Sequence, residues 1–152
     1  MNGNIDGVVV TPLKRIPDER GAVYHMLRKD DSVFKQFGEV YFSIVHPGAI
    51  KAWHMHKLMT LNYAVVAGKI KMVLYDGRKD SKTKENIMEI FLGKDNYCLV
   101  TVPPGIVNGF KGLGKEDSIV VNCATHPHDP NEIKRIDPFT KDIPYNWDIR
   151  HG

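Results

Sequence analysis

Residues 48–56 read Gly48-Ala-Ile-Lys-Ala-Trp-His54-Met-His56, and this segment carries the strongest structural signal in the chain. Successive side chains of a β-strand point to opposite faces of the sheet. On a strand, His54 and His56 therefore project together, while Trp53 and Met55 take the other face. The pattern predicts a strand that presents two imidazoles to one side, either into a barrel or out of it.

Strand-length apolar runs lie on both sides of this segment. They are rich in β-branched and aromatic residues, and glycine- or proline-containing turns separate them. The runs are residues 7–10, 39–45, 63–66, 70–75, 87–92, 97–102 and 118–121. No apolar period of 3.6 persists between residues 39 and 123, so the sequence disfavours a helix-rich or βαβ plan. It predicts an all-β sandwich or barrel.

Two segments outside these runs have a different pattern. We expect a short helix in residues 31–37, because residues 30–32 offer helix caps and Phe34 and Phe37 are three positions apart. The tail after His126 is rich in proline, aspartate and histidine. We expect this tail to wrap around the barrel as loop and short turns.

The composition is that of an ordinary globular protein. A length of 152 residues fits one domain, so we expect a single domain over residues 1–152. Hydrophobic residues make up 42% and charged residues 26% of the chain, which favours a folded core over disorder. The formal net charge is +3, but lysine and arginine form no dense block. This distribution argues against a nucleic-acid partner.

The cysteines and the N-terminus indicate a cytoplasmic protein. Cys98 and Cys123 are the two cysteines, and they show neither CxxC spacing nor the pattern of a disulfide framework. The first residues lack a basic segment followed by an apolar stretch, and no apolar run approaches the length of a transmembrane helix. We therefore expect neither export nor a membrane partner.

The histidine segment resembles the first of two motifs that define the cupins. The motifs have the forms G-x5-H-x-H-x3,4-E-x6-G and P-x-G-x2-H. The matching residues are Gly48, His54, His56 and Gly68 for the first motif, and Pro103 and Gly105 for the second. The resemblance implies the cupin jelly roll, a double-stranded β-helix.

Two positions of the cupin metal site carry other residues. The glutamate position falls on Leu61, and the second-motif histidine falls on Asn108. A transition-metal site usually needs three or four suitable protein ligands, and two histidines with a weak amide fall short of that. The residues therefore favour a site without a metal. A metal-dependent cupin enzyme stays an alternative, as does a pair of histidines that only hydrogen-bond within the barrel.

A resemblance over nearly the whole chain is to the dTDP-4-dehydrorhamnose 3,5-epimerase group of cupins. Residues 50–54 look like that group's L-R-G-L-H segment, and residues 102–110 are similar to its V-P-P-G-F-A-H-G-F segment. The other similar segments, in the same order, are residues 18–24, 65–78 and 129–132 with 143–147. The resemblance implies an enzyme without metal or cofactor that acts on a nucleotide-linked 4-keto-6-deoxy sugar, in surface-polysaccharide or secondary-metabolite synthesis.

The chemistry of this group needs a base beside a ketone. Protons next to the sugar ketone are acidic enough for a positioned general base, provided that the enolate oxygen is stabilised. The resemblance implies that His54 is this catalytic base and that the protein is a homodimer with strands exchanged between subunits. The substrate-binding candidates are Arg20, Tyr24, Lys51, His56, Lys57 and Asn108.

Three catalytic positions of the group carry no matching residue. The tyrosine that supplies a proton from the opposite sugar face falls on Val121, and the enolate-stabilising lysine falls near Leu61, with Lys57 the nearest substitute. The aspartate that orients the base belongs to a C-terminal segment that this sequence does not contain. Candidate proton donors are Tyr24, Tyr63, Cys123 and His56. A cupin that binds a sugar nucleotide without converting it therefore stays an alternative.

Overall fold

The computed structural model describes residues 3–152, and these residues form strands, turns and loops without a helix. The strands are β1 (Val9–Pro12), β2 (Arg15–Asp18), β3 (Gly21–Tyr24), β4 (Glu39–Val45), β5 (Ile50–His56), β6 (Leu61–Ala67), β7 (Lys69–Tyr75), β8 (Ile87–Gly93), β9 (Cys98–Val102), β10 (Val107–Leu113), β11 (Ser118–Ala124) and β12 (Ile133–Arg135). Accordingly, no helix in residues 3–152 has the length and apolar character needed to cross a membrane.

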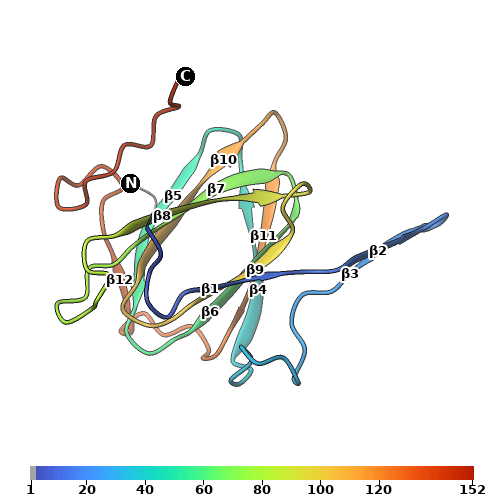
Figure 1. The fold of residues 1–152 in the computed structure, drawn as a ribbon, viewed down its shortest axis with the longest axis horizontal. Helices are drawn as coiled ribbons and strands as arrows, with labels where there is room; N and C mark the ends of the chain where they lie inside the picture. Colours follow the sequence, from blue (N-terminus) through green and yellow to red (C-terminus); the bar gives the residue numbers. More distant parts are fainter. Residues whose placement is uncertain (1–2) are drawn as a thin grey trace.

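Two five-stranded antiparallel sheets face each other and enclose the core (Figure 1). One has the order β1-β9-β6-β11-β4 and the other has the order β12-β5-β10-β7-β8. The strands β2 and β3 pair with each other and project from this body as a hairpin (Figure 1). The predicted all-β jelly roll is confirmed.

Strand β7 shows why several apolar runs lack polar alternation. One face of β7 places Ile70, Met72 and Leu74 in the main core between the sheets. The other face places Val73 in a second cluster with Trp53 and Trp147, beneath the C-terminal tail. A strand that is covered on both faces needs apolar residues at nearly every position.

The turn between β6 and β7 depends on Gly68, the last glycine of the first cupin motif. Its φ is +72°, and a Cβ placed there would lie 2.4 Å from Oγ of Ser118. A side chain at this position would therefore meet both backbone strain and a steric clash. Gly68 lets β6 turn into the opposite sheet, and this turn brings Tyr63 to face the histidine strand.

The helix expected in residues 31–37 is wrong, because this segment forms turns. The Asp31 side-chain carboxylate accepts a hydrogen bond from the backbone N–H of Arg28. The backbone carbonyl of Asp31 accepts one from the backbone N–H of Phe34. A segment of this length gains few helical hydrogen bonds against a costly nucleus. The tail after His126 is loop and turn as expected, except that residues 133–135 form β12 and pair with β5.

Candidate active site

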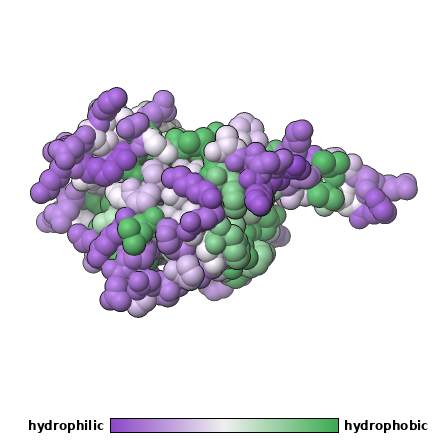
Figure 2. Space-filling model, turned by 90° about the horizontal axis from the view of Figure 1, so that it is seen from below, coloured by the Kyte–Doolittle hydropathy of each residue, from purple (hydrophilic) through white to green (hydrophobic). Residues whose placement is uncertain are grey.

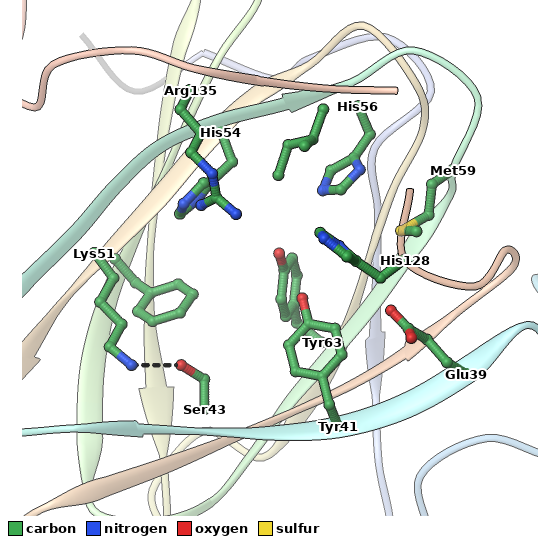
Figure 3. Close-up of a pocket in the computed structure, with 12 residues that line it drawn as sticks. Glu39, Tyr41, Ser43, Lys51, His54, His56, Met59, Tyr63, His128 and Arg135 are labelled. Atoms are coloured by element: carbon green, nitrogen blue, oxygen red, sulfur yellow. Dashed lines mark hydrogen bonds between the residues drawn. The ribbon is translucent and has the colours of Figure 1, made fainter. Parts of the chain in front are cut away.

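A cavity of about 410 Å³ opens between the two sheets (Figure 3). Strand β5 lines one side with Lys51, His54 and His56, and β12 adds Arg135. Strands β4 and β6 line the opposite side, and the segment after β11 adds His128. His54 and His56 share one face of β5, as expected, and this face points into the cavity, while Trp53 is buried on the other face against the tail.

His54 is half-buried, and its surroundings favour the neutral imidazole. Burial lowers the pKa of His54 to about 4, and the positive charges of Arg135 and Lys51 act in the same direction, as does His56. At neutral pH the ring therefore carries a free lone pair. A neutral imidazole at the wall of a cavity is suited to accept a proton.

His56 is buried and lies against a carboxylate. Its Nδ1 hydrogen-bonds to Oε1 of Glu132, while Oε2 accepts the backbone N–H groups of Lys57 and Leu58, both at 3.1 Å. Burial would raise the pKa of Glu132, but the hydrogen bonds from His56 and from the backbone outweigh it and hold that pKa below its usual value. Glu132 is therefore ionised at neutral pH and fixes the plane of the His56 ring.

Two tyrosines stand across the cavity from the histidines (Figure 3). The buried Tyr63 hydroxyl donates to Oδ1 of Asn108 at 3.2 Å, and Nδ2 of Asn108 donates to the His54 carbonyl at 3.2 Å. Burial, together with Tyr41, holds the pKa of Tyr63 well above its usual value. Tyr63 therefore keeps its proton at neutral pH and faces the histidine side of the cavity.

The cations of the cavity lie on the histidine side. Nζ of Lys51 donates to Oγ of Ser43 at 2.9 Å, which joins β5 to β4 across the opening. Arg135 lies opposite His54 in the register of β12 and β5, and its guanidinium enters the cavity beside that histidine (Figure 3). The two positive charges make this wall suited to an anionic ligand.

The other predicted site residues lie apart from this cavity. Arg20 and Tyr24 are on the projecting hairpin, where Arg20 is highly exposed and pairs with Asp18 at 2.6 Å. Lys57 points away, and its Nζ donates to the Asn131 carbonyl. Asn108 is fully buried and acts through its hydrogen bonds to Tyr63 and His54.

The alternative of a metal-dependent cupin requires a cluster of metal ligands. Within residues 3–152, no group of three or more histidine, cysteine, aspartate or glutamate side chains is arranged to hold a metal ion. Both functional groups of the Asn108 amide already serve Tyr63 and the His54 carbonyl.

The sequence did not single out Tyr41, His128 and Arg135 for this cavity. The alternation in β4 contains a signal for Tyr41, because Glu39, Tyr41 and Ser43 share one face. Polar residues on the inner face are unusual for a barrel strand. The pattern alone therefore did not show whether this face of β4 points into the barrel or toward solvent. His128 and Arg135 come from the tail, and only its pairing with β5 brings them near.

Comparison with known proteins gives one family and several relatives. The family model described as dTDP-4-dehydrorhamnose 3,5-epimerase matches residues 2–151. The spore coat polysaccharide biosynthesis protein SpsL of Bacillus subtilis is 35% identical over 145 residues, covering 94% of this chain and 96% of that protein. The probable low-salt glycan biosynthesis epimerase Agl13 of Haloferax volcanii is 33% identical, covering 94% of this chain and 90% of that protein.

Solved structures agree in fold. A dTDP sugar isomerase from Desulfovibrio desulfuricans superimposes with a TM-score of 0.92 at 43% identity, covering 94% of this chain and 92% of that chain. The rmlC epimerase of Mycobacterium tuberculosis superimposes with a TM-score of 0.84 at 18% identity, covering 96% of this chain and 76% of that chain. The second similarity concerns the fold alone.

Proposed function

Because the chain belongs to the dTDP-4-dehydrorhamnose 3,5-epimerase family, we propose that it inverts a carbon next to the ketone of a nucleotide-linked 4-keto-6-deoxy sugar. The observation that carries the proposal is the cavity, in which His54 and Tyr63 stand on opposite walls (Figure 3). Inversion requires a proton to leave one face of the sugar and another to arrive at the other face. A base on one wall and a proton donor on the other meet that requirement without a metal or cofactor.

His54 is the base of this mechanism. With a pKa of about 4, its ring is neutral at pH 7 and takes the proton from the carbon beside the ketone, leaving an enolate. Tyr63 holds its proton at the same pH and delivers it to the opposite face of that carbon. Exchange with solvent then restores both groups. Return of the proton by His54 to the original face would give exchange without inversion.

Cations of this chain and of a second copy bind the diphosphate. Lys51 and Arg135 lie on the His54 wall, where a diphosphate would offset the positive charges that lower the pKa of His54. Arg20 and Tyr24 are on the hairpin of the same chain, which projects away from the body (Figure 1). In a homodimer, we assign these two residues to the cavity of the neighbouring subunit.

The outer face of β4 supports a homodimer. Its alternation is inverted, because Val40, Phe42 and Ile44 point outward and are exposed while polar residues line the cavity. Strand β4 is also the edge of its sheet, so its outer backbone groups are open to pairing. Hydrophobic surface gathers on the body where the hairpin leaves it (Figure 2). A second copy would cover this apolar face and bring its hairpin across.

We place the reaction in the cytoplasm, where sugar nucleotides supply surface-polysaccharide synthesis, and a solvent-exchange experiment tests it. The protein is incubated with dTDP-4-keto-6-deoxyglucose in heavy water, and deuterium at C3 and C5 is followed by NMR. We expect deuterium at one or both carbons together with a new epimer, and a loss of at least about 100-fold in His54→Gln. The absence of deuterium uptake by the wild-type protein would overturn the proposal.

Two further measurements separate the alternatives. Saturable binding of the same sugar nucleotide by calorimetry, without deuterium uptake, would favour a binding protein that has lost catalysis. Stoichiometric metal in the gently purified protein, with activity lost on chelation, would favour a metal-dependent cupin. We expect uptake that is insensitive to chelation.

A further inference from the structure

The proposed reaction leaves one chemical need unmet. When the proton next to the ketone leaves, negative charge develops on the ketone oxygen, and a donor must stabilise it. His54 cannot serve, because it is accepting the proton, and Tyr63 lies on the far wall. The group for this task must lie on the His54 side of the cavity and carry a hydrogen toward it.

His56 meets this description. It follows His54 by two positions on β5, lines the same cavity, and is 7% exposed. Glu132 holds its Nδ1, so the opposite ring nitrogen, Nε2, is directed toward the cavity (Figure 3). Among residues 3–152, Nε2 has no hydrogen-bond partner, so it is open to a ligand.

Glu132 is itself unusually well anchored. It is 6% exposed, and its Oε2 accepts the backbone N–H groups of Lys57, Leu58 and Met59. These bonds keep the carboxylate ionised and fixed in orientation. An ionised, buried carboxylate at Nδ1 balances the charge that His56 carries when both of its nitrogens hold a proton.

The geometry points to His56 as a second catalytic residue, which protonates the ketone oxygen while His54 removes the carbon-bound proton. The C–H bond breaks and its proton binds to His54. The Nε2–H bond of His56 breaks and its proton binds to the oxygen, which gives a neutral enol. When the ketone reforms, the oxygen returns its proton to His56. Glu132 is a positioning residue, and the inference rests on the proposed function.

Other cavity groups are less suited to this role. Arg135 donates hydrogen bonds but does not release a proton at these pH values. Lys51 is engaged with Ser43 at the opening. A structural role for the His56–Glu132 pair, which would join β5 to the tail, is weaker because backbone pairing of β12 with β5 already joins them.

The experiment compares His56→Gln with His46→Gln. His46 pairs with Asp117 at 2.7 Å, but that pair is exposed and lies outside the cavity, so it is a matched control. With dTDP-4-keto-6-deoxyglucose, we expect kcat and deuterium uptake of His56→Gln to fall together by about 100-fold or more. The dissociation constant for dTDP should stay within about twofold of wild type. His46→Gln should match the wild type throughout.

Glu132→Gln provides a pH readout that a purely structural pair would not change. The amide removes the charge at Nδ1 but leaves an oxygen for the backbone N–H groups. Because the acid must be protonated to act, the alkaline limb of the kcat profile should move to lower pH. The other charged and titratable groups that line the cavity are the same in both proteins, namely Glu39, Tyr41, Lys51, His54, Tyr63, His128 and Arg135.

The possible outcomes distinguish a failure of the His56 role from a failure of the proposed epimerase function. If the wild type takes up deuterium and His56→Gln keeps kcat within about threefold, the inference is wrong and the proposed function stands. An unshifted alkaline limb in Glu132→Gln would also overturn it, even if His56→Gln failed to fold. If the wild type takes up no deuterium, the proposed function fails and this inference fails with it.

Discussion

The imidazole of His54 lies beside Arg135 and Lys51, whereas that of His56 lies beside Glu132. The two residues are two positions apart on one strand, so they share a face and a cavity. Their charged neighbours come from other parts of the chain and differ in sign. Burial and positive neighbours favour a neutral His54 ring that accepts a proton, whereas the Glu132 carboxylate holds the His56 ring through Nδ1. This difference is the basis for giving the two histidines different tasks.

The pKa of His54 predicts how stability depends on pH. In the unfolded chain the ring gains its proton near pH 6.5, whereas in the folded chain burial lowers the pKa to about 4. The unfolded state therefore binds more protons between these values, and stability falls as the pH drops from 6.5 toward 4. We expect the urea midpoint of the wild type to fall more steeply across this window than that of His54→Gln. His151→Gln, at an exposed histidine, should follow the wild type, and parallel curves for His54→Gln would contradict the assignment.

The C-terminal tail is the element that closes the outer face of the histidine sheet. The Trp147 ring packs on Trp53 at 4.7 Å between centroids, and Nζ of Lys71 lies 5.9 Å from the centroid of the Trp147 ring. The Lys71 ammonium also lies 5.3 Å from the centroid of the Tyr145 ring. Because Trp53 directly precedes His54, the tail supports the strand that carries the two cavity histidines.

Removal of the Trp147 side chain should therefore be costly. Trp147 is 2% exposed, so Trp147→Ala should lower the free energy of unfolding by about 3 kcal/mol or more, through lost packing and a residual cavity. Phe139, in the same tail, is 73% exposed, and Phe139→Ala should change it by no more than about 0.5 kcal/mol. Urea unfolding of the two variants checks this expectation. Equal effects would mean that the tail is not anchored by Trp147.

At the scale of elements, the strands were predictable where period and turn agreed. The run over residues 39–45 is β4 itself, and the two-residue period placed His54 and His56 together. Strand β10 was not predicted as a strand, because Gly109 and Gly112 weaken the pattern. Both glycines are there for close approach, since a Cβ on Gly109 would lie 2.4 Å from Cβ of Ala52.

Contacts between distant segments were beyond the local pattern. Glu132 is 76 positions from His56, and only the pairing of β12 with β5 brings them together. The sequence placed Tyr63 on a strand but did not show which face of the sheet its side chain occupies, because β6 is buried on both faces along much of its length. Local periodicity shows which side chains share a face, whereas the partner across the cavity depends on the order of strands in the two sheets.

At the scale of the whole molecule, one chain holds the cavity and a hairpin that does not reach it. Arg20 on this hairpin has a side chain that is 85% exposed, and Ile16 and Val23 beside it are exposed as well. Exposed apolar residues on a two-stranded hairpin gain little in an isolated chain, since such a hairpin is marginal alone. In the proposed homodimer, a second copy would give both the hairpin and the outer face of β4 a partner.

Subunit complementation tests whether Arg20 acts in the neighbouring cavity. Arg20→Ala and His54→Gln homodimers should each be nearly inactive toward dTDP-4-keto-6-deoxyglucose, for loss of diphosphate binding and of the base respectively. A heterodimer would hold one cavity with intact His54 and an intact Arg20 from its neighbour. Co-expression in equal amounts should therefore restore about a quarter of the wild-type activity per subunit, because half of the dimers are mixed and each has one complete site.

The same experiment contains a test of the interface. Phe42→Asp in both chains places a charge on the exposed apolar face of β4, and it should abolish complementation and leave a species of 17.2 kDa by light scattering. Phe91→Asp, at an exposed phenylalanine of β8 in the other sheet, should leave both the dimer and the complementation intact. Restored activity requires Arg20 to act across subunits, since a site completed within one chain would be defective in every mixed dimer. If the mixture stays inactive while the dimer forms, Arg20 does not act in the cavity of the neighbouring subunit.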